Sequence, residues 1–203
     1  MKGGQNVVEE QVLLKKSQEG DIAAFEKLIE GYQKRVFNIA YRLVGNYDDA
    51  SELAQEVFIK VFKSLRKFKG QSSFSTWVYS ITKNVCFDEL RKRKNKKIVY
   101  IDEDIKYDNN EMQRQIEDDR PQPDIIAEKN EVKKIVHEAI QELSQDHRIV
   151  IVMRDIQGFS YEEIARILNC PEGTVKSRIN RARLSLKQIL QKNEELLKGY
   201  YVK

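Results

Sequence analysis

The sequence predicts an all-α protein in which an acidic, flexible linker joins two small helical domains, the C-terminal one a helix-turn-helix. Apolar residues recur every three or four positions through most of the chain, which is the spacing of amphipathic helices. That spacing fades at residues 98–124, where acidic residues and prolines gather. Only Ile98–Ile101 resembles a strand. The predicted domains are therefore residues 1–97 and 125–203, with the linker at 98–124.

Charge is distributed unevenly along the 203 residues. Charged residues make up 33% of the chain and the formal net charge is only +4. Residues 60–97, however, contain twelve Lys or Arg and two acids, whereas residues 102–124 contain nine Asp or Glu and three basic residues. This segregation predicts surfaces that face a polyanion, separated by an acidic connector.

The cysteine content and the hydropathy of the chain predict its compartment. Cys86 and Cys170 are the only cysteines, too few for a disulfide framework, so we expect both to be reduced. No apolar run approaches the roughly 20 residues of a membrane span, and no signal peptide opens the chain. We therefore expect a cytoplasmic protein that is not inserted directly into a membrane.

Helix-capping residues divide the first part of the chain. A short helix is expected around residues 9–18, with Gly20 ending it. Asp21 is a suitable N-cap for a long amphipathic helix over residues 22–43. Gly45 stops that helix.

A third helix is expected to start at Asp48 or Asp49 and to continue to about residue 65. One face of this helix is apolar, and the other is mixed and carries several acids. Phe58 lies beside the mixed face, where an exposed aromatic residue would suit a partner contact. The alternative is that Phe58 belongs to the core, because large aromatic residues are usually buried.

The next segment combines basic and aromatic residues. A basic loop at residues 65–73 leads to a helix capped by Ser72 or Ser73, which continues to Leu90 and frays into the basic residues 91–97. Single-stranded nucleic acid is bound by such combinations, because unpaired bases stack on aromatic rings while Lys and Arg neutralise phosphates. Trp77 has the spacing of a buried stripe, so the basic residues carry the stronger signal.

The C-terminal part predicts four helices. Helical stripes cover residues 125–143 and 149–156. Ser160 and Glu163 form a capping box for a short third helix, and Pro171 suits the first position of the fourth. The last two helices, with the break between them, form a helix-turn-helix.

The final helix has two faces. We expect its inner face to consist of Val175, Ile179, Ala182 and Leu186, and its outer face of Lys176, Ser177, Asn180 and Arg181. Arg and Lys match guanine acceptors in the major groove and Asn matches adenine, so the outer face predicts a reader of duplex DNA. The alternative is a solvated basic face on a structural helical hairpin.

Enzyme chemistry finds little support in the residues. His137 and His147 lie ten positions apart without a paired zinc-ligand spacing, and no Gly-rich phosphate loop is present. We therefore expect no catalytic residues, no cofactor and no metal.

Three segments together carry a family resemblance. They are residues 49–58 (DASELAQEVF), residues 74–84 (FSTWVYSITKN) and the helix-turn-helix at 163–183. In this order and spacing the chain, from Asp21 to Leu190, resembles bacterial sigma factors of the extracytoplasmic-function (ECF) group. The resemblance implies two helical domains that bind core RNA polymerase and promoter DNA and direct transcription initiation, together with a partner anti-sigma factor.

The resemblance also assigns sites to residues of this sequence. The implied contacts with core polymerase are Asp49, Glu52, Leu53, Gln55, Glu56 and Phe58. Those with the minus-ten element and its melted strand are Phe68, Lys69, Trp77, Lys83, Asn84, Arg91 and Lys94. Those with the upstream minus-thirty-five element are Thr174, Lys176, Ser177, Arg178, Asn180 and Arg181.

Two departures from the family pattern limit this transfer. Ser51 stands where the family more often has an acid, which weakens the acidic pattern of the polymerase-facing helix. Asn180 occupies a position that varies within the family, so the resemblance does not predict which promoter sequence is read. A second interpretation is a stand-alone helix-turn-helix regulator whose N-terminal helices bind a ligand or another subunit. A third is a helical RNA-binding or structural adaptor.

Overall fold

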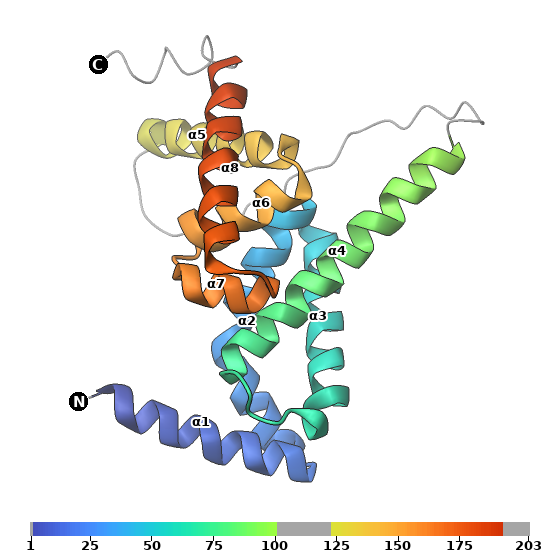
Figure 1. Cartoon of the computed structure of the whole chain (residues 1–203), viewed down its shortest axis with the longest axis vertical. Coiled ribbons are helices and arrows are strands. Elements are labelled where there is room, and N and C mark those ends of the chain that lie inside the picture. The colour runs from blue at the N-terminus through green and yellow to red at the C-terminus, as the bar shows by residue number, and fades with distance from the viewer. Residues whose placement is uncertain (1, 101–122, 193–203) are drawn as a thin grey trace.

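The computed structural model describes residues 2–100 and 123–192, and in those ranges the chain is helical with short connections (Figure 1). The N-terminal part contains α1 (Lys2–Glu19), α2 (Ile22–Val44), α3 (Tyr47–Ser64), a 3₁₀ turn η1 (Leu65–Lys67) and α4 (Phe74–Tyr100). The C-terminal part contains α5 (Pro123–Glu142), α6 (Gln145–Ile151), a π-helix η2 (Val152–Ile156), α7 (Tyr161–Leu168) and α8 (Glu172–Lys192). The all-α prediction is confirmed. The predicted linker bounds of 98–124 are wrong at both ends, because residues 98–100 belong to α4 and residues 123–124 to α5. Residues 101–122 of the predicted linker lie outside the described residues.

Capping explains where α2 begins and ends. The Asp21 side chain accepts a hydrogen bond from the Ala24 amide at 3.0 Å, as predicted. Gly45 ends the helix in the left-handed region, with φ of 93°, and its amide donates to the Tyr41 carbonyl at 2.9 Å. Glycine adopts this conformation without steric penalty, which explains the stop.

The start of α3 differs from the prediction. Asn46, not Asp48 or Asp49, is the N-cap, because its side-chain oxygen accepts from the Asp49 amide at 2.8 Å. Asp48 and Asp49 lie instead in the first turn, where their negative charge favours the positive end of the helix dipole.

Helix α4 is longer than predicted. Ser73 caps it, with Oγ accepting from the Thr76 amide at 3.2 Å. The predicted fraying after Leu90 is wrong, because the helix continues to Tyr100. Ion pairs at helical spacing, such as Arg93 with Glu89 at 2.9 Å, support this extension. The possible strand at Ile98–Ile101 is wrong as far as Tyr100, and Ile101 lies outside the described residues.

The apolar helix expected at 149–156 is interrupted. It is α-helical to Ile151 and then widens into the π-helix η2, which places Ile156 at 40% exposure although an inward position was predicted. A π-turn contains more residues than an α-turn and so rotates the side chains that follow it. Helix α8 starts one residue later than predicted, and the Pro171 carbonyl accepts from the Thr174 amide at 3.0 Å.

The two parts share one apolar core. Helices α2, α3 and α4 contribute Val36, Ile39, Val57, Val61 and Val78, and the C-terminal helices contribute Ile149, Val152, Ile164, Val175 and Ile179, all fully buried. These side chains belong to a continuous cluster. The C-terminal helices therefore pack directly against the N-terminal ones (Figure 1).

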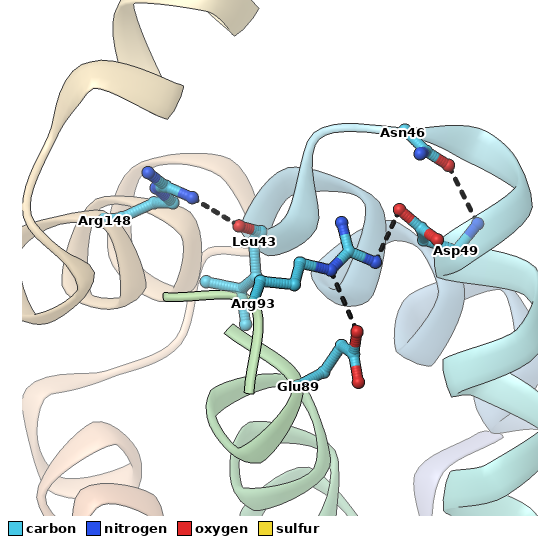
Figure 2. A network of polar contacts seen from close by, with 6 residues as sticks. All are labelled: Leu43, Asn46, Asp49, Glu89, Arg93 and Arg148. Atoms are coloured by element: carbon cyan, nitrogen blue, oxygen red, sulfur yellow. Dashed lines mark hydrogen bonds and ion pairs between the residues drawn. The ribbon is translucent and has the colours of Figure 1, made fainter. Parts of the chain in front are cut away.

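Polar contacts also join the two parts at the C-terminal end of α2. The Arg148 guanidinium of α6 donates to the Leu43 carbonyl at 2.5 Å (Figure 2). Gln141 of α5 donates to the Arg42 carbonyl at 2.9 Å, and His137 lies 3.1 Å from the Gly45 carbonyl. We call these contacts the interdomain joint.

Candidate nucleic-acid interface

The helix-turn-helix is built as the sequence predicts. Ser160 Oγ accepts from the Glu163 amide at 3.1 Å, and the Glu163 carboxylate accepts from the Ser160 amide at 2.8 Å. This reciprocal capping box starts α7. Asn169 ends it in the left-handed region with φ of 52°, which an Asn side chain tolerates. The chain can then turn sharply into α8.

Helix α8 points its basic face outward. Val175, Ile179 and Ala182 are fully buried, which confirms the predicted inner face at these three positions; Leu186 is half-buried. The opposite face carries exposed side chains, namely Lys176, Ser177, Asn180 and Arg181. Helix α8 is thus held by its apolar stripe and presents hydrogen-bond donors and acceptors to solvent.

Several of these side chains already have partners within the chain. Arg181 Nη2 donates to Ser177 Oγ at 3.2 Å, which places the two polar groups side by side. Lys176 pairs with Glu172 at 2.7 Å, and this carboxylate raises the pKa of the exposed lysine. A charged lysine is what a phosphate or base contact requires.

Arg178 and Thr174 lie differently from the rest of the outer face. Arg178 is half-buried and lies 3.6 Å from Asp146 of α6, so its guanidinium also ties α8 to α6. Thr174 is half-buried, and its carbonyl accepts from Ser177 Oγ at 3.0 Å.

The basic loop at residues 65–73 rests on an aromatic cluster, defined here as Phe68, Phe74 and Trp77. The Phe68 ring centroid lies 4.9 Å from that of Trp77 and 5.9 Å from that of Phe74. Phe74 is buried, whereas Phe68 and Trp77 are half-buried. Lys69 is exposed beside this cluster. The cluster therefore holds the loop and still leaves ring surface accessible.

A basic cavity of about 380 Å³ opens between the end of α3 and the middle of α4. It is lined by Lys60, Lys63, Ser64, Lys67, Ile81, Asn84 and Val85. Asn84 is exposed and contributes an amide that can both donate and accept hydrogen bonds. Lys63 and Lys67 together with the Asn84 amide suit a nucleotide, which carries a phosphate and a base edge.

Three further residues predicted to contact the minus-ten element lie on α4. Arg91 and Lys94 are exposed, and Arg91 pairs with Asp88 at 2.5 Å. Lys83 is half-buried, with Nζ 5.9 Å from the centre of the Phe87 ring.

The residues predicted to contact polymerase are divided between the surface and the interior of α3. Glu52 and Gln55 are exposed, and Glu56 pairs with Lys60 at 2.8 Å. Leu53 is only 6% exposed and belongs to the core. Phe58 is half-buried against that core, which lies between the two predicted roles of core residue and partner contact.

Asp49 is engaged within the chain. Its carboxylate lies 2.6 Å from Arg93 of α4, whose Nε also donates to Glu89 at 2.9 Å (Figure 2). Arg93 was not among the predicted residues. Its i−4 spacing from Glu89 is visible in the sequence, but the pairing with Asp49 depends on how α4 crosses α3.

Sequence reasoning also missed two features of the surface. Arg183 of α8 donates two hydrogen bonds to the Asp155 carboxylate, from Nε at 3.1 Å and from Nη2 at 2.5 Å. Ile59 is 52% exposed on α3, next to Phe58 in the sequence. A helical wheel places Ile59 on the same side as Gln55, so periodicity could have found it.

The two candidate interfaces meet where α7 packs on α4. Ser80 Oγ donates to the Ile167 carbonyl at 3.4 Å, and the rings of Tyr79 and Phe159 lie edge to face at 5.0 Å. The Arg35 guanidinium stacks over Phe159 at 4.9 Å. In this arrangement the first helix of the helix-turn-helix covers one edge of α4.

No group of three or more His, Cys, Asp or Glu side chains is placed to hold a metal ion among the described residues. Across residues 2–100 and 123–192, each helix is too short or too polar to cross a membrane.

Comparison with known proteins identifies two matching family models. Residues 28–96 match sigma-70 region 2, and residues 133–186 match sigma-70 region 4. The chain is 35% identical to the RNA polymerase sigma-H factor of Pseudomonas aeruginosa over 90% of its length and 94% of the relative's. It is 35% identical to the ECF RNA polymerase sigma-E factor of Escherichia coli, again over 90% of this chain and 94% of that one. It is 34% identical to the ECF sigma factor SigW of Bacillus subtilis, over 88% and 95%.

Solved structures give a consistent result. The sigma factor RpoE of Bartonella quintana, solved in complex with the anti-sigma factor NepR, matches with a TM-score of 0.62 and 26% identity, over 82% of this chain and 96% of that chain. CnrH, solved with the cytosolic domain of CnrY, matches with a TM-score of 0.63 over 90% and 97%. Its identity is 23%, so this second match supports the fold alone.

Proposed function

This chain belongs to the ECF RNA polymerase sigma factors, and on that premise we propose how its residues divide the work of promoter-specific transcription initiation. A sigma factor is not an enzyme, and it acts by binding core RNA polymerase and promoter DNA. Bond chemistry therefore belongs to the polymerase. What this chain contributes is binding energy and geometry.

The C-terminal helix-turn-helix reads the upstream promoter element as duplex. One observation carries this assignment, namely that α8 buries an apolar stripe and exposes Lys176, Ser177, Asn180 and Arg181 on its other side. A helix of this kind fits the major groove, where Arg, Lys and Asn distinguish bases. Thr174 and Arg178 lie at the border of this face, suited to phosphate contacts.

The N-terminal domain captures the melted minus-ten strand. Asn84 and three lysines line the cavity between α3 and α4. A nucleotide of the single strand places its extruded base in this cavity, and the phosphates on either side of its sugar contact Lys63 and Lys67. Phe68, Lys69 and Trp77 accept the neighbouring bases, and Lys83, Arg91 and Lys94 follow the backbone along α4.

Strand opening is driven by several such contacts together. Each captured base contributes about 1–3 kcal/mol of stacking. Unpairing a base costs a few kcal/mol, so one pocket alone does not suffice. The aromatic cluster and the basic cavity lie on adjoining parts of α4, which allows them to act on successive nucleotides.

The exposed face of α3 docks on core polymerase. Glu52, Gln55 and Glu56 present acidic and amide groups there, with Phe58 and Ile59 beside them. Leu53 and Asp49 contribute by fixing the helix, the first in the core and the second through Arg93.

We extend the proposal to partners and location. An anti-sigma factor holds this protein inactive, because RpoE of Bartonella quintana is similar over 82% of this chain and binds one. The protein acts in the cytoplasm, where core polymerase and promoter DNA are found. The acidic segment between α4 and α5, residues 101–122, connects the two promoter contacts.

Run-off transcription from a genomic fragment library with purified core polymerase tests this function. The protein should direct promoter-specific transcripts and should bind free promoter fragments weakly without core enzyme. A stand-alone regulator would bind an operator tightly without polymerase and yield no specific transcript. That second outcome would overturn the proposal.

A further inference from the structure

Helix α1 contacts the base of the basic loop through one side chain. Gln18, the last residue but one of α1, is half-buried. Its Nε2 donates to the carbonyl of Leu65 at 3.1 Å and to the carbonyl of Phe68 at 3.1 Å. Leu65 opens the 3₁₀ turn η1, and the Phe68 amide closes the turn on the same Leu65 carbonyl at 3.1 Å. A single amide therefore binds both ends of the turn that leads out of α3.

A second contact from α1 supports the aromatic cluster from behind. The Tyr32 hydroxyl donates to the Glu10 carboxylate of α1 at 2.6 Å. The Tyr32 ring lies edge to face against Phe74 at 5.4 Å, and Phe74 in turn contacts Phe68. Helix α1 thus holds the backbone of the loop through Gln18 and its aromatic base through Tyr32.

The loop beyond this base has few contacts of its own. Lys69, Gly70 and Gln71 are all exposed, and Gly70 adopts a φ of +70° with no heavy atom within 4 Å of an added Cβ. The course of this exposed tip is set by its two ends, the turn at Leu65–Phe68 and the Ser73 cap of α4. Gln18 holds the backbone of the first of these ends by hydrogen bonds, while Phe74 and Trp77 pack against the Phe68 ring.

We propose that Gln18 is a positioning residue for strand opening: it fixes the turn Leu65–Phe68 so that Phe68 and Lys69 face the melting strand. This inference rests on the proposed assignment of Phe68 and Lys69 to the minus-ten contact. Gln18 itself does not touch DNA. Its role is to lower the cost of ordering the loop when single-stranded DNA arrives, because a preorganised group loses less conformational freedom on binding.

Two substitutions separate this role from general packing. Gln18→Met keeps the length of the side chain and removes both donors. Gln18→Glu keeps the shape and directs a carboxylate at two carbonyl oxygens, which repel it. Gln11 is the matched control, because it is an exposed amide on the same helix.

The experiment uses holoenzyme reconstituted from core polymerase and the full chain, on a promoter with a fluorescent base analogue in the minus-ten element. Gln18→Met should open this promoter about tenfold more slowly, the effect of losing two net hydrogen bonds. Gln18→Glu should be slower still, and Gln11→Met should match wild type. Affinity for core polymerase and protection of the upstream element should stay unchanged in all three.

Two results would overturn the proposal. One is wild-type opening by Gln18→Met. The other is a parallel loss of opening, core affinity and thermal stability, which marks Gln18 as a packing residue only. A wild-type holoenzyme that opens no promoter would instead refute the proposed function, and this inference with it.

Discussion

Arg148 of α6 donates a hydrogen bond to the Leu43 carbonyl at the C-terminal end of α2, with 2.5 Å between the two atoms (Figure 2). The same guanidinium donates to the carbonyls of Gln141 and Leu143 at the end of α5. A cation at a helix C-terminus is favourable because it opposes the helix dipole, and here one cation serves two helices. Arg148 therefore joins the N-terminal domain to the C-terminal one.

Removing this guanidinium should weaken the folded chain. Burial lowers the pKa of Arg148, and several helix-end carbonyls would lose their donor in Arg148→Met. We expect the free energy of unfolding to fall by about 2–4 kcal/mol, the usual cost of breaking a buried charged hydrogen-bond network. Urea denaturation measures this change. The exposed Arg66→Met is the control, and a loss no larger than that of the control would contradict the prediction.

The interdomain joint should also respond to pH through His137. Burial lowers the pKa of this histidine, and the neighbouring Arg42 and Arg148 lower it further, while its contact with the Gly45 carbonyl acts in the opposite direction. The folded state therefore binds fewer protons than the unfolded state, whose histidine titrates at its ordinary value. The stability that neutral His137 contributes is complete well above that value and is lost as the pH falls from about 6.5 through the lowered pKa of the folded state.

Denaturation midpoints between about pH 7.5 and about pH 5.5 check this prediction. His137→Gln should flatten the decrease in stability, because glutamine does not titrate. The same change at His147, on α6 outside the joint contacts, controls for the loss of a histidine. A wild-type slope in His137→Gln would show that other groups cause the pH dependence.

The pair of Arg93 and Asp49 should couple α4 to α3 weakly but measurably. The arginine side chain is 36% exposed and the aspartate 26%, so solvent screens much of the attraction. A double-mutant cycle with Arg93→Met and Asp49→Asn should give a coupling energy of about 0.5–1 kcal/mol. The more exposed pair of Arg91 and Asp88 should give less. Equal coupling in the two cycles would contradict a structural role for Arg93.

Arg181 tests base reading by α8. If its exposed guanidinium contacts a base, Arg181→Ala should reduce discrimination at one upstream position by about 1–3 kcal/mol. Competition binding of holoenzyme to promoter variants measures this. Lys187→Ala, an exposed cation further along α8, is the control. A uniform loss on every sequence, with a smaller salt dependence, would instead mark a phosphate contact.

Local signals predicted most of the helix boundaries. Asp21, Gly45 and the Ser160 capping box act over three or four residues, so their effects can be read from the sequence alone. At α3 three neighbouring residues compete for the same cap, and the choice of Asn46 over Asp48 depends on backbone geometry. Where several capping residues stand close together, the sequence predicts the start of a helix only to within a few residues.

The candidate site was predictable where it follows helical periodicity. The outer face of α8 is one example, because a period of 3.6 separates Lys176 and Asn180 from buried Val175. Contacts between distant segments were not predictable. Arg93 with Asp49, and Arg148 with Leu43, depend on how helices cross, which no local pattern specifies.

We propose that the two domains make separate promoter contacts, with duplex reading by α8 and strand opening at α4. Permanganate reactivity of minus-ten thymines, measured together with upstream protection, tests it most directly. Holoenzyme with Asn84→Ala should keep upstream protection and lose minus-ten reactivity, whereas Arg181→Ala should lose upstream protection first. Equal loss of both signals in both variants would contradict the claim.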